Sequence, residues 1–357
     1  MSTPEDLKTL RRRIDEIDDS LLDRINERIS LAVAIGANKA DRGEAVYRPE
    51  REAQILERLV EANPGPLSKA SVRAIFREII SAARSAEAPI RVAALGPRGT
   101  FSEQAAVKVF GQQAIVCEAS SIKEVFRLTE VGETQFGVVP IENSTEGGIN
   151  ATLDLMMDSS LVICNEVELR VSHCLLSHPE ARAPRQIAAH EQALAQCRVW
   201  LGENYPKIPQ VASSSTAEAA RSAAADPGIL AVASEAAASV YGLEIKAREI
   251  EDLRGNTTRF LVLSKERVGP SGKDKTSLVV ANSDRAGALL RLLQPLADAG
   301  ISMTRIESRP MRAELWRYVF FIDIQGHIED PLIEKTLRLI EAESAMFRIL
   351  GSYPRSS

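Results

Sequence analysis

Positively charged side chains recur along one face of an apolar helical pattern near the start of the chain. Arg24 and Arg28 fall on the apolar line, and Lys39, eleven residues after Arg28, returns to nearly the same face. Arg11 points about a quarter-turn away from that line. A guanidinium keeps its proton, so a buried arginine requires an anionic partner. The array predicts a binding site for a small dicarboxylate, with Arg11 directed towards a different neighbour.

A continuous helix is needed to hold these cations in line. Its apolar residues alternate by three and four, as in a helix that packs along its length: Leu7, Leu10, Ile14, Ile17, Leu21, Leu31 and Ile35. After a polar turn, Pro49 opens a second predicted helix, which ends at Asn63–Pro66, and a third runs from Ser68 to Glu87. Three helices cannot cover the far half of the first one. We therefore expect a dimer in which the long helices pack against each other.

Composition limits the class of protein. The 357 residues suffice for two or three domains, and the net charge of -5 gives no reason to expect nucleic-acid or membrane binding. No apolar run approaches the roughly 20 residues that cross a bilayer, and the first residues do not resemble a secretory signal. Four scattered cysteines fit reduced thiols, and four histidines lack metal-ligand spacing. We expect a cytoplasmic protein without a metal ion.

The hydrophobic period changes after Ile90, where short apolar runs begin to alternate with helical stretches. The predicted strands are Arg91–Leu95, Ala114–Cys117, Phe136–Ile141, Ile187–Ala189, Ile208–Ala212, Ile229–Ala233 and Arg259–Ser264. This rhythm is typical of α/β layers whose strands are covered on both faces. The long run Leu161–Leu176 is expected to carry the chain from one lobe to another.

A short linker at Gly269–Lys273 separates this section from the last one. The predicted elements that follow are a strand at Thr276–Ala281, a helix at Ala286–Ala299, strands at Ile301–Ser308 and Tyr318–Ile324, a helix at Pro331–Glu341 and a strand at Phe347–Leu350. This βαββαβ order predicts a ferredoxin-like unit. The section contains no plausible pair of base and nucleophile.

Local motifs add a resemblance that covers nearly the whole chain. They are Gly96–Glu103, Pro140–Gly148, Asn256–Phe260, Gly287–Leu289 and Glu307–Pro310. With the order of the three sections, they resemble the bifunctional chorismate mutase–prephenate dehydratases of phenylalanine biosynthesis. The resemblance implies a multidomain fold with an all-α mutase domain at 1–88, a two-lobed α/β dehydratase domain similar to periplasmic binding proteins at 89–268, and an α+β ferredoxin-like ACT regulatory domain at 274–354.

By this resemblance, the mutase domain binds chorismate, and Arg11 reaches the partner subunit's site. The rearrangement to prephenate is pericyclic, so the protein has to hold the dianion in a compact form and stabilise negative charge on the ether oxygen. Lys39 would serve that oxygen, and Glu52 the substrate hydroxyl. The full predicted set is Arg11, Arg28, Lys39, Arg48, Arg51, Glu52 and Glu87.

Three positions depart from some relatives. Glu87 stands where those relatives have glutamine, Arg48 where they have an acid, and Ala83 where they have serine. An ionised carboxylate at Glu87 would repel the substrate, so we expect Glu87 to act in its protonated form. Mutase activity would then fall as the pH rises, and comparison of its pH profile with that of a Glu87→Gln variant measures this.

The dehydratase step removes carbon dioxide and hydroxide from prephenate and leaves phenylpyruvate. Hydroxide leaves poorly unless a proton is donated to it, so the reaction requires at least one hydroxyl group fixed in place as a proton donor. The resemblance assigns this role to Thr258, with Arg259 close to the cleft. Ser102 and Ser215, near helix starts, would present amide donors to the carboxylates. The other predicted substrate-binding residues are Asn143, Ser144 and Gln196. Neither reaction implies a metal or an organic cofactor.

The resemblance also implies that phenylalanine binds at an ACT–ACT interface and closes the dehydratase, which requires two states of different affinity. Gly287 allows close backbone approach at a helix start. The predicted effector residues are Gly287, Ala288, Leu289, Glu307, Ser308, Arg309 and Pro310. We expect a homodimer or a dimer of dimers.

Two other interpretations remain open from the sequence. A non-catalytic sensor would combine a two-lobed solute-binding fold with an amino-acid-binding domain, and its N-terminal helices would serve only dimerisation. A second alternative keeps the dehydratase and treats the mutase section as degenerate, which only Arg48, Ala83 and Glu87 support. Arg28 and Lys39 could instead pair with acidic residues of a coiled partner helix.

The four histidines are expected to be structural or exposed.

Overall fold

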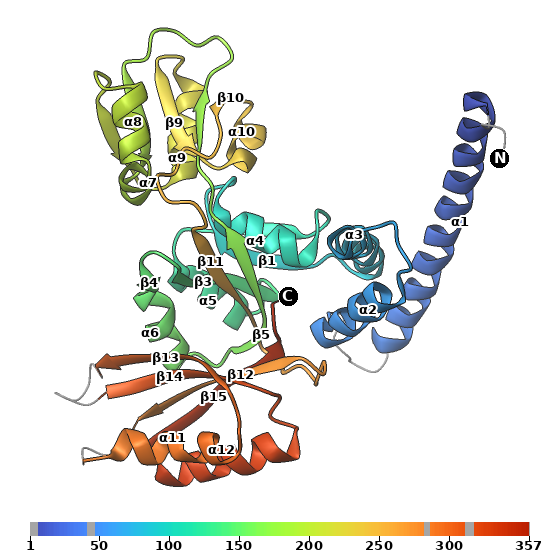
Figure 1. Cartoon of the computed structure of the whole chain (residues 1–357), viewed down its shortest axis with the longest axis vertical. Helices are drawn as coiled ribbons and strands as arrows, with labels where there is room; N and C mark the ends of the chain where they lie inside the picture. The colour runs from blue at the N-terminus through green and yellow to red at the C-terminus, as the bar shows by residue number, and fades with distance from the viewer. Residues whose placement is uncertain (1–5, 41–46, 282–285, 311–317, 357) are drawn as a thin grey trace, which may run out of the picture. The chain divides into compact units, whose positions relative to one another are not determined.

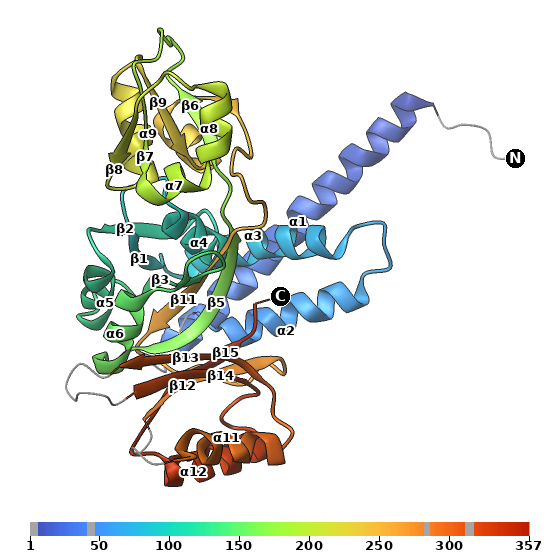
Figure 2. The same cartoon turned by 60° about the vertical axis from the view of Figure 1, so that its left-hand side comes forward.

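The computed structural model describes residues 6–40, 47–281, 286–310 and 318–356, apart from the side chains of residues 38–40. These residues form two compact units. The first comprises the described residues up to Arg48 together with Gln54–Ile90 and Phe110–Ile115. The second comprises Pro49–Ala53, Arg91–Val109 and the described chain from Val116 onward. Figures 1 and 2 show the elements of both units.

Three helices form the N-terminal section: α1 (Leu7–Ala40), α2 (Pro49–Ala62) and α3 (Lys69–Glu87). Pro49 occupies the first turn of α2, and the Ser68 hydroxyl caps α3 by accepting the Ser71 N–H at 3.0 Å. The three predicted helices are therefore confirmed. The apolar residues of the α1 seam are each 40% to 70% exposed: Leu7, Leu10, Ile14, Ile17, Leu21, Leu31 and Ile35.

Lobe 1 of the second unit is a mixed sheet in the order β2-β1-β3-β11-β5, with the short β4 beside β3. Its strands are β1 (Arg91–Leu95), β2 (Ile115–Ala119), β3 (Phe136–Asn143), β4 (Gly147–Gly148), β5 (Val162–Arg170) and β11 (Thr257–Ser264). Its helices are α4 (Phe101–Phe110), α5 (Ile122–Glu130) and α6 (Asn150–Asp158). β1 runs parallel to β3, whereas β11 is antiparallel to both β3 and β5.

Lobe 2 is a second mixed sheet, in the order β10-β6-β9-β7-β8. Its strands are β6 (Cys174–Ser177), β7 (Gln186–His190), β8 (Gln210–Ser213), β9 (Ile229–Ala233) and β10 (Glu244–Ala247). Its helices are α7 (Glu191–Gln196), α8 (Arg198–Asn204), α9 (Thr216–Ala225) and α10 (Glu235–Tyr241). Alanines of α9, among them Ala219 and Ala223, are fully buried against the sheet, because small side chains allow a helix to approach it closely.

Two segments connect the lobes. The chain passes from β5 to β6 within the run Leu161–Leu176, so the predicted crossing is confirmed. It returns between β10 and β11. Hydrogen bonds hold the two segments together, because Val171 N donates to Asn256 O at 2.8 Å and Ile250 N donates to His173 O at 3.0 Å.

The C-terminal section is an antiparallel sheet in the order β13-β14-β12-β15. Its elements are β12 (Asp274–Ala281), α11 (Ala288–Asp298), β13 (Met303–Pro310), β14 (Tyr318–Gln325), α12 (Pro331–Glu343) and β15 (Met346–Pro354). Helices α11 and α12 cover one face (Figures 1 and 2). The other face joins the core of lobe 1, where Phe321 and Leu350 share a buried cluster with Ile163 and Leu261.

The predicted fold class is confirmed: helices, then a two-lobed α/β section, then a ferredoxin-like sheet. The sequence predicted β5 and β6 only as one crossing run, Leu161–Leu176. It did not predict β4 and β10, because a two-residue strand and a short, partly exposed edge strand carry little apolar pattern. β15 is longer than predicted, because the residues after Leu350 pair with the start of β12. None of the helices in the described residues combines the length and apolarity needed to cross a lipid bilayer.

Candidate active site

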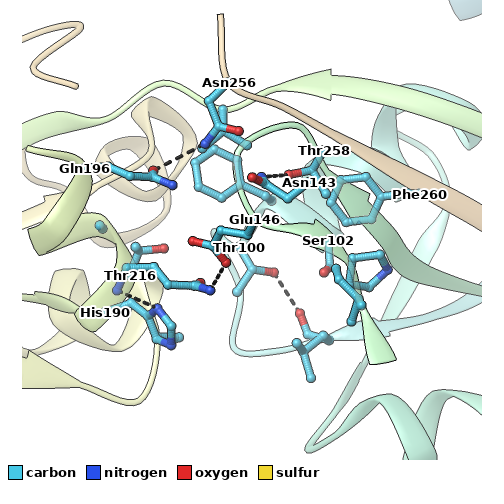
Figure 3. Close-up of a pocket in the computed structure, with 18 of the residues that line it drawn as sticks. Thr100, Ser102, Asn143, Glu146, His190, Gln196, Thr216, Asn256, Thr258 and Phe260 are labelled. Carbon is cyan, nitrogen blue, oxygen red and sulfur yellow. Dashed lines mark hydrogen bonds between the residues drawn. The ribbon is translucent and has the colours of Figure 1, made fainter. Parts of the chain in front are cut away.

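A cavity of about 500 Å³ lies between the two lobes of the second unit. A cavity of this size encloses one small ligand. Figure 3 shows side chains of both lobes facing one another across it. Its polar lining comes from lobe 1 (Thr100, Ser102, Asn143, Glu146, Thr258), from lobe 2 (His190, Gln192, Gln196, Ser214, Ser215, Thr216) and from the connecting segments (His173, Asn256).

Thr258 and Asn143 are neighbours across two antiparallel strands. The register pairs them directly, and Asn143 Nδ2 donates to Thr258 Oγ1 at 2.8 Å (Figure 3). The backbone N–H of Thr145 orients the Asn143 amide by donating to its Oδ1 at 3.0 Å. Within the described residues, the Thr258 hydroxyl accepts this bond and gives its own proton to no protein acceptor. That proton can be donated into the cavity.

A second polar network joins lobe 2 to the connecting segments. Gln196 Oε1 accepts from Asn256 Nδ2 at 3.3 Å and lies 2.9 Å from His173 Nε2. An amide oxygen only accepts, so Nε2 of His173 carries the proton and Nδ1 carries a lone pair. Nδ1 is buried and has no hydrogen-bond partner in the described part of the chain. Gln196 Nε2 lies 3.5 Å from Thr145 Oγ1, so this network reaches the residue that orients Asn143.

Burial lowers the pKa of His173, although the bond to Gln196 and the charge of Glu251 act in the opposite direction. The unfolded chain protonates this histidine near pH 6.5, whereas the folded chain does so only at lower pH. Stability contributed by the neutral ring is therefore present above about pH 6.5 and is lost as the pH falls towards the lowered folded value.

A His173→Gln variant is expected to lose part of this pH dependence. The glutamine amide can donate to Gln196 but does not titrate. Between pH 7.5 and 5.5, the free energy of unfolding in urea should fall less steeply for the variant, by up to about 1.4 kcal/mol per pH unit. The other three histidines, His178, His190 and His327, are present in both proteins and cancel in the comparison. Equal slopes for the two proteins would contradict the neutral buried ring.

No lysine or arginine lines this cavity among the residues that the structure describes. Positive potential comes instead from two ten-residue helices that begin there. Ser102 lies in the first turn of α4, and the Ser215 hydroxyl caps α9 by accepting the Glu218 N–H at 3.0 Å. First-turn N–H groups without helical partners bind carboxylates well. The lining can therefore hold a small anion with backbone and neutral side-chain donors.

Two residues predicted for this site do not line the cavity. Arg259 follows Thr258 on β11, and successive strand residues face opposite sides, so its guanidinium lies 2.7 Å from carboxylates of Glu166 and Asp323. The expectation that Arg259 lies close to the cleft overlooked this alternation. Ser144 holds the turn after β3, because its hydroxyl accepts the Thr257 N–H at 3.0 Å. The predicted residues that do line the cavity are Ser102, Asn143, Gln196, Ser215 and Thr258.

In the first unit, Arg28 is partly buried on α1, and its Nη1 has no hydrogen-bond partner among the described residues. Arg11 is exposed. Glu87 lies against Gly36 of α1, where an added methyl group would approach Glu87 Cγ at 2.8 Å. The Lys39 side chain lies outside the described residues. Of the remaining residues predicted for chorismate, Arg48 belongs to the first unit, whereas Arg51 and Glu52, in the first turn of α2, belong to the second.

The residues predicted for an effector occupy the start of α11 and the strand β13. Gly287 has φ of +74°, a conformation that favours glycine. Along β13, Glu307 packs against Gly148 and Arg309 Nη2 lies 3.1 Å from Asp154 of α6, so both face lobe 1. Ser308 and Pro310 are exposed. At the start of α11, Ala288 is buried and Leu289 is partly buried.

Sequence reasoning missed His173 and Glu146 as cavity residues. His173 lies in the segment that was predicted to cross between the lobes, and such a segment has to pass the cleft between them. That placement was the available signal. Glu146 belongs to a motif that was recognised, but no role was assigned to it; in the structure Gln192 Nε2 donates to its carboxylate across the cavity (Figure 3).

Three family models match the chain: chorismate mutase type II over residues 10–88, prephenate dehydratase over 92–268 and the ACT domain over 276–340. The bifunctional chorismate mutase/prephenate dehydratase of Stutzerimonas stutzeri is 46% identical over 363 residues, which cover 100% of both chains. A solved prephenate dehydratase from Arthrobacter aurescens, in complex with L-Phe, is 34% identical with a TM-score of 0.69 and covers 75% of this chain and 90% of that one. A protein described as a novel type of quorum-quenching acylase is 31% identical, also with a TM-score of 0.69, over 74% of this chain and 98% of that chain.

Proposed function

Because the chain belongs to the bifunctional chorismate mutase/prephenate dehydratase family, we propose that Thr258 and Asn143 carry its dehydratase reaction and that Arg28 belongs to its chorismate site. The enzyme rearranges chorismate to prephenate and then converts prephenate to phenylpyruvate, and phenylalanine inhibits it. One observation carries the assignment of the dehydratase site: Asn143 donates to Thr258, which leaves the threonine proton for the cavity.

In the dehydratase reaction, the bond from the ring to its carboxylate breaks and carbon dioxide leaves. The electron pair moves into the ring, which becomes aromatic, and the ring hydroxyl on the opposite carbon leaves as hydroxide. Thr258 donates a hydrogen bond to this oxygen and stabilises the negative charge that grows on it. The N-termini of α4 and α9 bind the substrate carboxylates, with Ser102 and Ser215 at those termini. Gln196 orients the substrate from lobe 2.

In the mutase reaction, no proton moves and no covalent intermediate forms. Arg28 binds a substrate carboxylate, which supplies the acceptor that its Nη1 otherwise lacks among the described residues. Lys39 stabilises the ether oxygen, and Glu87 donates to it in protonated form. Glu52 holds the substrate hydroxyl, while Arg48 and Arg51 add positive charge at the start of α2. Arg11 acts in the site of a second copy.

The enzyme forms a homodimer or a dimer of dimers through the α1 seam, which supplies Arg11 to the other subunit. Support comes from the seven apolar residues on one side of α1 that remain exposed in the single chain. Pairing two such helices buries both stripes. Sedimentation of the purified protein gives its mass in solution, and a monomer at micromolar concentration would contradict this assembly.

Phenylalanine binds near Gly287, Ser308 and Pro310, at the C-terminal sheet β13-β14-β12-β15, which we call the ACT sheet. The related dehydratase that was solved with L-Phe supports this ligand, and the exposed side of β13 supports this location. The domain boundaries are 1–88, 89–268 and 274–354. The enzyme acts in the cytoplasm, which fits four cysteines that are all free thiols.

A two-substrate assay tests the proposed function. The purified chain is expected to consume chorismate, to form phenylpyruvate from prephenate, and to lose dehydratase activity when phenylalanine is added. A non-catalytic sensor would consume neither substrate. A chain with a degenerate mutase section would act on prephenate alone. Either outcome would reject the bifunctional assignment.

A further inference from the structure

The strands that carry the Asn143–Thr258 pair present a second pair on their other side. The register of β3 and β11 places Arg259 opposite Glu142, one residue from the first pair. Because side chains alternate along a strand, Thr258 faces the cavity and Arg259 faces away from it. Arg259 Nη1 lies 3.9 Å from Glu142 Oε2. The Arg259–Glu142 ion pair is therefore only one residue along β11 and β3 from the Thr258–Asn143 pair.

Arg259 is held by groups from lobe 1 and from the ACT sheet. Its Nε donates to Glu166 of β5 at 2.7 Å, and its Nη1 lies 2.7 Å from Asp323 of β14. Its Nη2 donates to the Tyr353 hydroxyl of β15 at 3.0 Å. The side chains of Arg259, Glu166 and Asp323 are 11%, 2% and 5% exposed. Buried charges of this kind persist only with close partners, so the cluster fixes β11 against the ACT sheet.

A closed ring of three hydrogen bonds and one ion pair completes the cluster. Burial and the nearby carboxylates of Asp323 and Glu166 raise the pKa of Tyr353 well above its usual value, so its hydroxyl keeps its proton. That hydroxyl lies 2.6 Å from Ser277 Oγ, which donates to Asp323 Oδ1 at 2.6 Å. The Asp323–Arg259 contact closes the ring. Each donor has one acceptor, which leaves few alternative arrangements.

The strand of the predicted effector motif contacts the same region. Arg305, Glu307 and Arg309 alternate along β13 and all face lobe 1. Arg305 Nε lies 3.1 Å from Glu142 Oε2. Glu142 precedes Asn143 on β3. The ACT sheet therefore contacts β3 through Arg305 and β11 through Asp323, on the side of these strands that faces away from the cavity.

We propose that Arg259 is a positioning residue of the dehydratase: with Glu142 it ties the strands of Thr258 and Asn143 to the ACT sheet and transmits the position of that sheet to the reacting pair. The inference rests on the proposed function, because phenylalanine is the signal that moves the sheet. A shift of the strands that carry Asp323 and Arg305 changes the distance between Thr258 and Asn143 without any effector in the cavity.

Two conservative substitutions in the full-length enzyme test this. Arg259→Lys keeps the charge but loses the planar fork that spans Glu166, Asp323 and Tyr353. Tyr353→Phe keeps the buried ring and removes one hydroxyl. The matched control is Arg127→Lys in the same lobe. Arg127 also contacts two carboxylates, those of Glu124 and Glu133 at 2.8 and 3.0 Å, but its side chain is 48% exposed on α5.

Arg259→Lys is expected to lower kcat for prephenate about tenfold, with KM changed less than about twofold, and to weaken inhibition by saturating phenylalanine severalfold. Tyr353→Phe should change both quantities in the same direction, and Arg127→Lys neither. The proposal is overturned if both cluster variants keep wild-type kcat and wild-type inhibition below their melting temperatures, which indicates a purely structural cluster. It is also overturned if Arg259→Lys raises KM alone, which indicates substrate contact.

Circular dichroism and mutase activity report whether each variant is folded. Should Arg259→Lys fail to fold, Tyr353→Phe alone decides between the outcomes. The wild-type enzyme in the same assays tests the proposed function separately. If it forms no phenylpyruvate or ignores phenylalanine, the proposed function fails, whereas a normal wild type beside unaffected variants rejects only the role of Arg259.

Discussion

Replacing Thr258 by valine is expected to lower dehydratase kcat by about two to four orders of magnitude, the usual range for a lost proton donor. Valine has nearly the shape of threonine, so the loss reflects the hydroxyl. Thr258 is 7% exposed and receives a hydrogen bond from Asn143, so its oxygen is fixed in place before substrate arrives. Stopped assays for phenylpyruvate measure the change. Thr258→Ser should keep most of the activity, because it keeps the hydroxyl.

The neighbouring threonine provides the control. Thr257 donates its hydroxyl to Gly255 O at 3.3 Å and does not line the cavity, so Thr257→Val should leave dehydratase kcat within a few-fold of wild type. Chorismate mutase activity, carried by the other end of the same chain, should be unchanged in all three variants. Equal losses from Thr257→Val and Thr258→Val would show that strand β11 is disturbed as a whole, and would remove Thr258 from the proposed mechanism.

The second large effect is expected at the other site. Arg28→Met should lower mutase kcat/KM by about 30- to 5000-fold, equivalent to about 2–5 kcal/mol for a truncated buried charge pair. The reason is that Arg28 is partly buried and its Nη1 lacks a protein acceptor among the described residues, which leaves it for a substrate carboxylate. Loss of chorismate absorbance measures the rate. Dehydratase activity on added prephenate should be unaffected.

Arg24 is the matched control, because it lies one helical turn earlier on the same apolar line. Arg24 Nη1 donates to Glu27 Oε2 at 2.9 Å, and both side chains are exposed, so its charge is already paired in solvent. Arg24→Met should therefore change mutase activity little, as surface ion pairs contribute little. If both variants lose activity equally, or if neither does, Arg28 is a packing residue of the helix and not a ligand of chorismate.

Local pattern predicted the elements well where the pattern was strong. The seam of α1, the proline at the start of α2 and the βαββαβ order all reflect short-range spacing, and their helices and strands lie within a few residues of the predicted bounds. β4 and β10 were missed because pairing with a neighbouring strand, not their own sequence, creates them. Such pairing depends on contacts distant in the chain.

The site was harder to predict, because it depends on which way a side chain faces. The predicted strand began at Arg259, so Thr258 lay outside it and the alternation that separates the two was not applied. In the structure both belong to β11, and they face opposite sides. His173 gave no local signal, since its partner Gln196 is 23 residues away and Asn256 is contributed by the returning segment. The contacts of Arg259 with Asp323 and Tyr353 join separate domains, which no local motif reports.

The two crossing segments make lobe 2 an insertion. β5 and β11 are adjacent antiparallel strands whose ends, Arg170 and Thr257, pair directly. A tight turn between those two residues would turn the strands into a simple hairpin. Lobe 2, which contributes Gln196 and the start of α9 to the cavity, is thus inserted between β5 and β11, and two stretches of chain connect it to lobe 1. A change confined to lobe 2 would therefore alter one half of the cavity lining while Thr258 stays in its own strand.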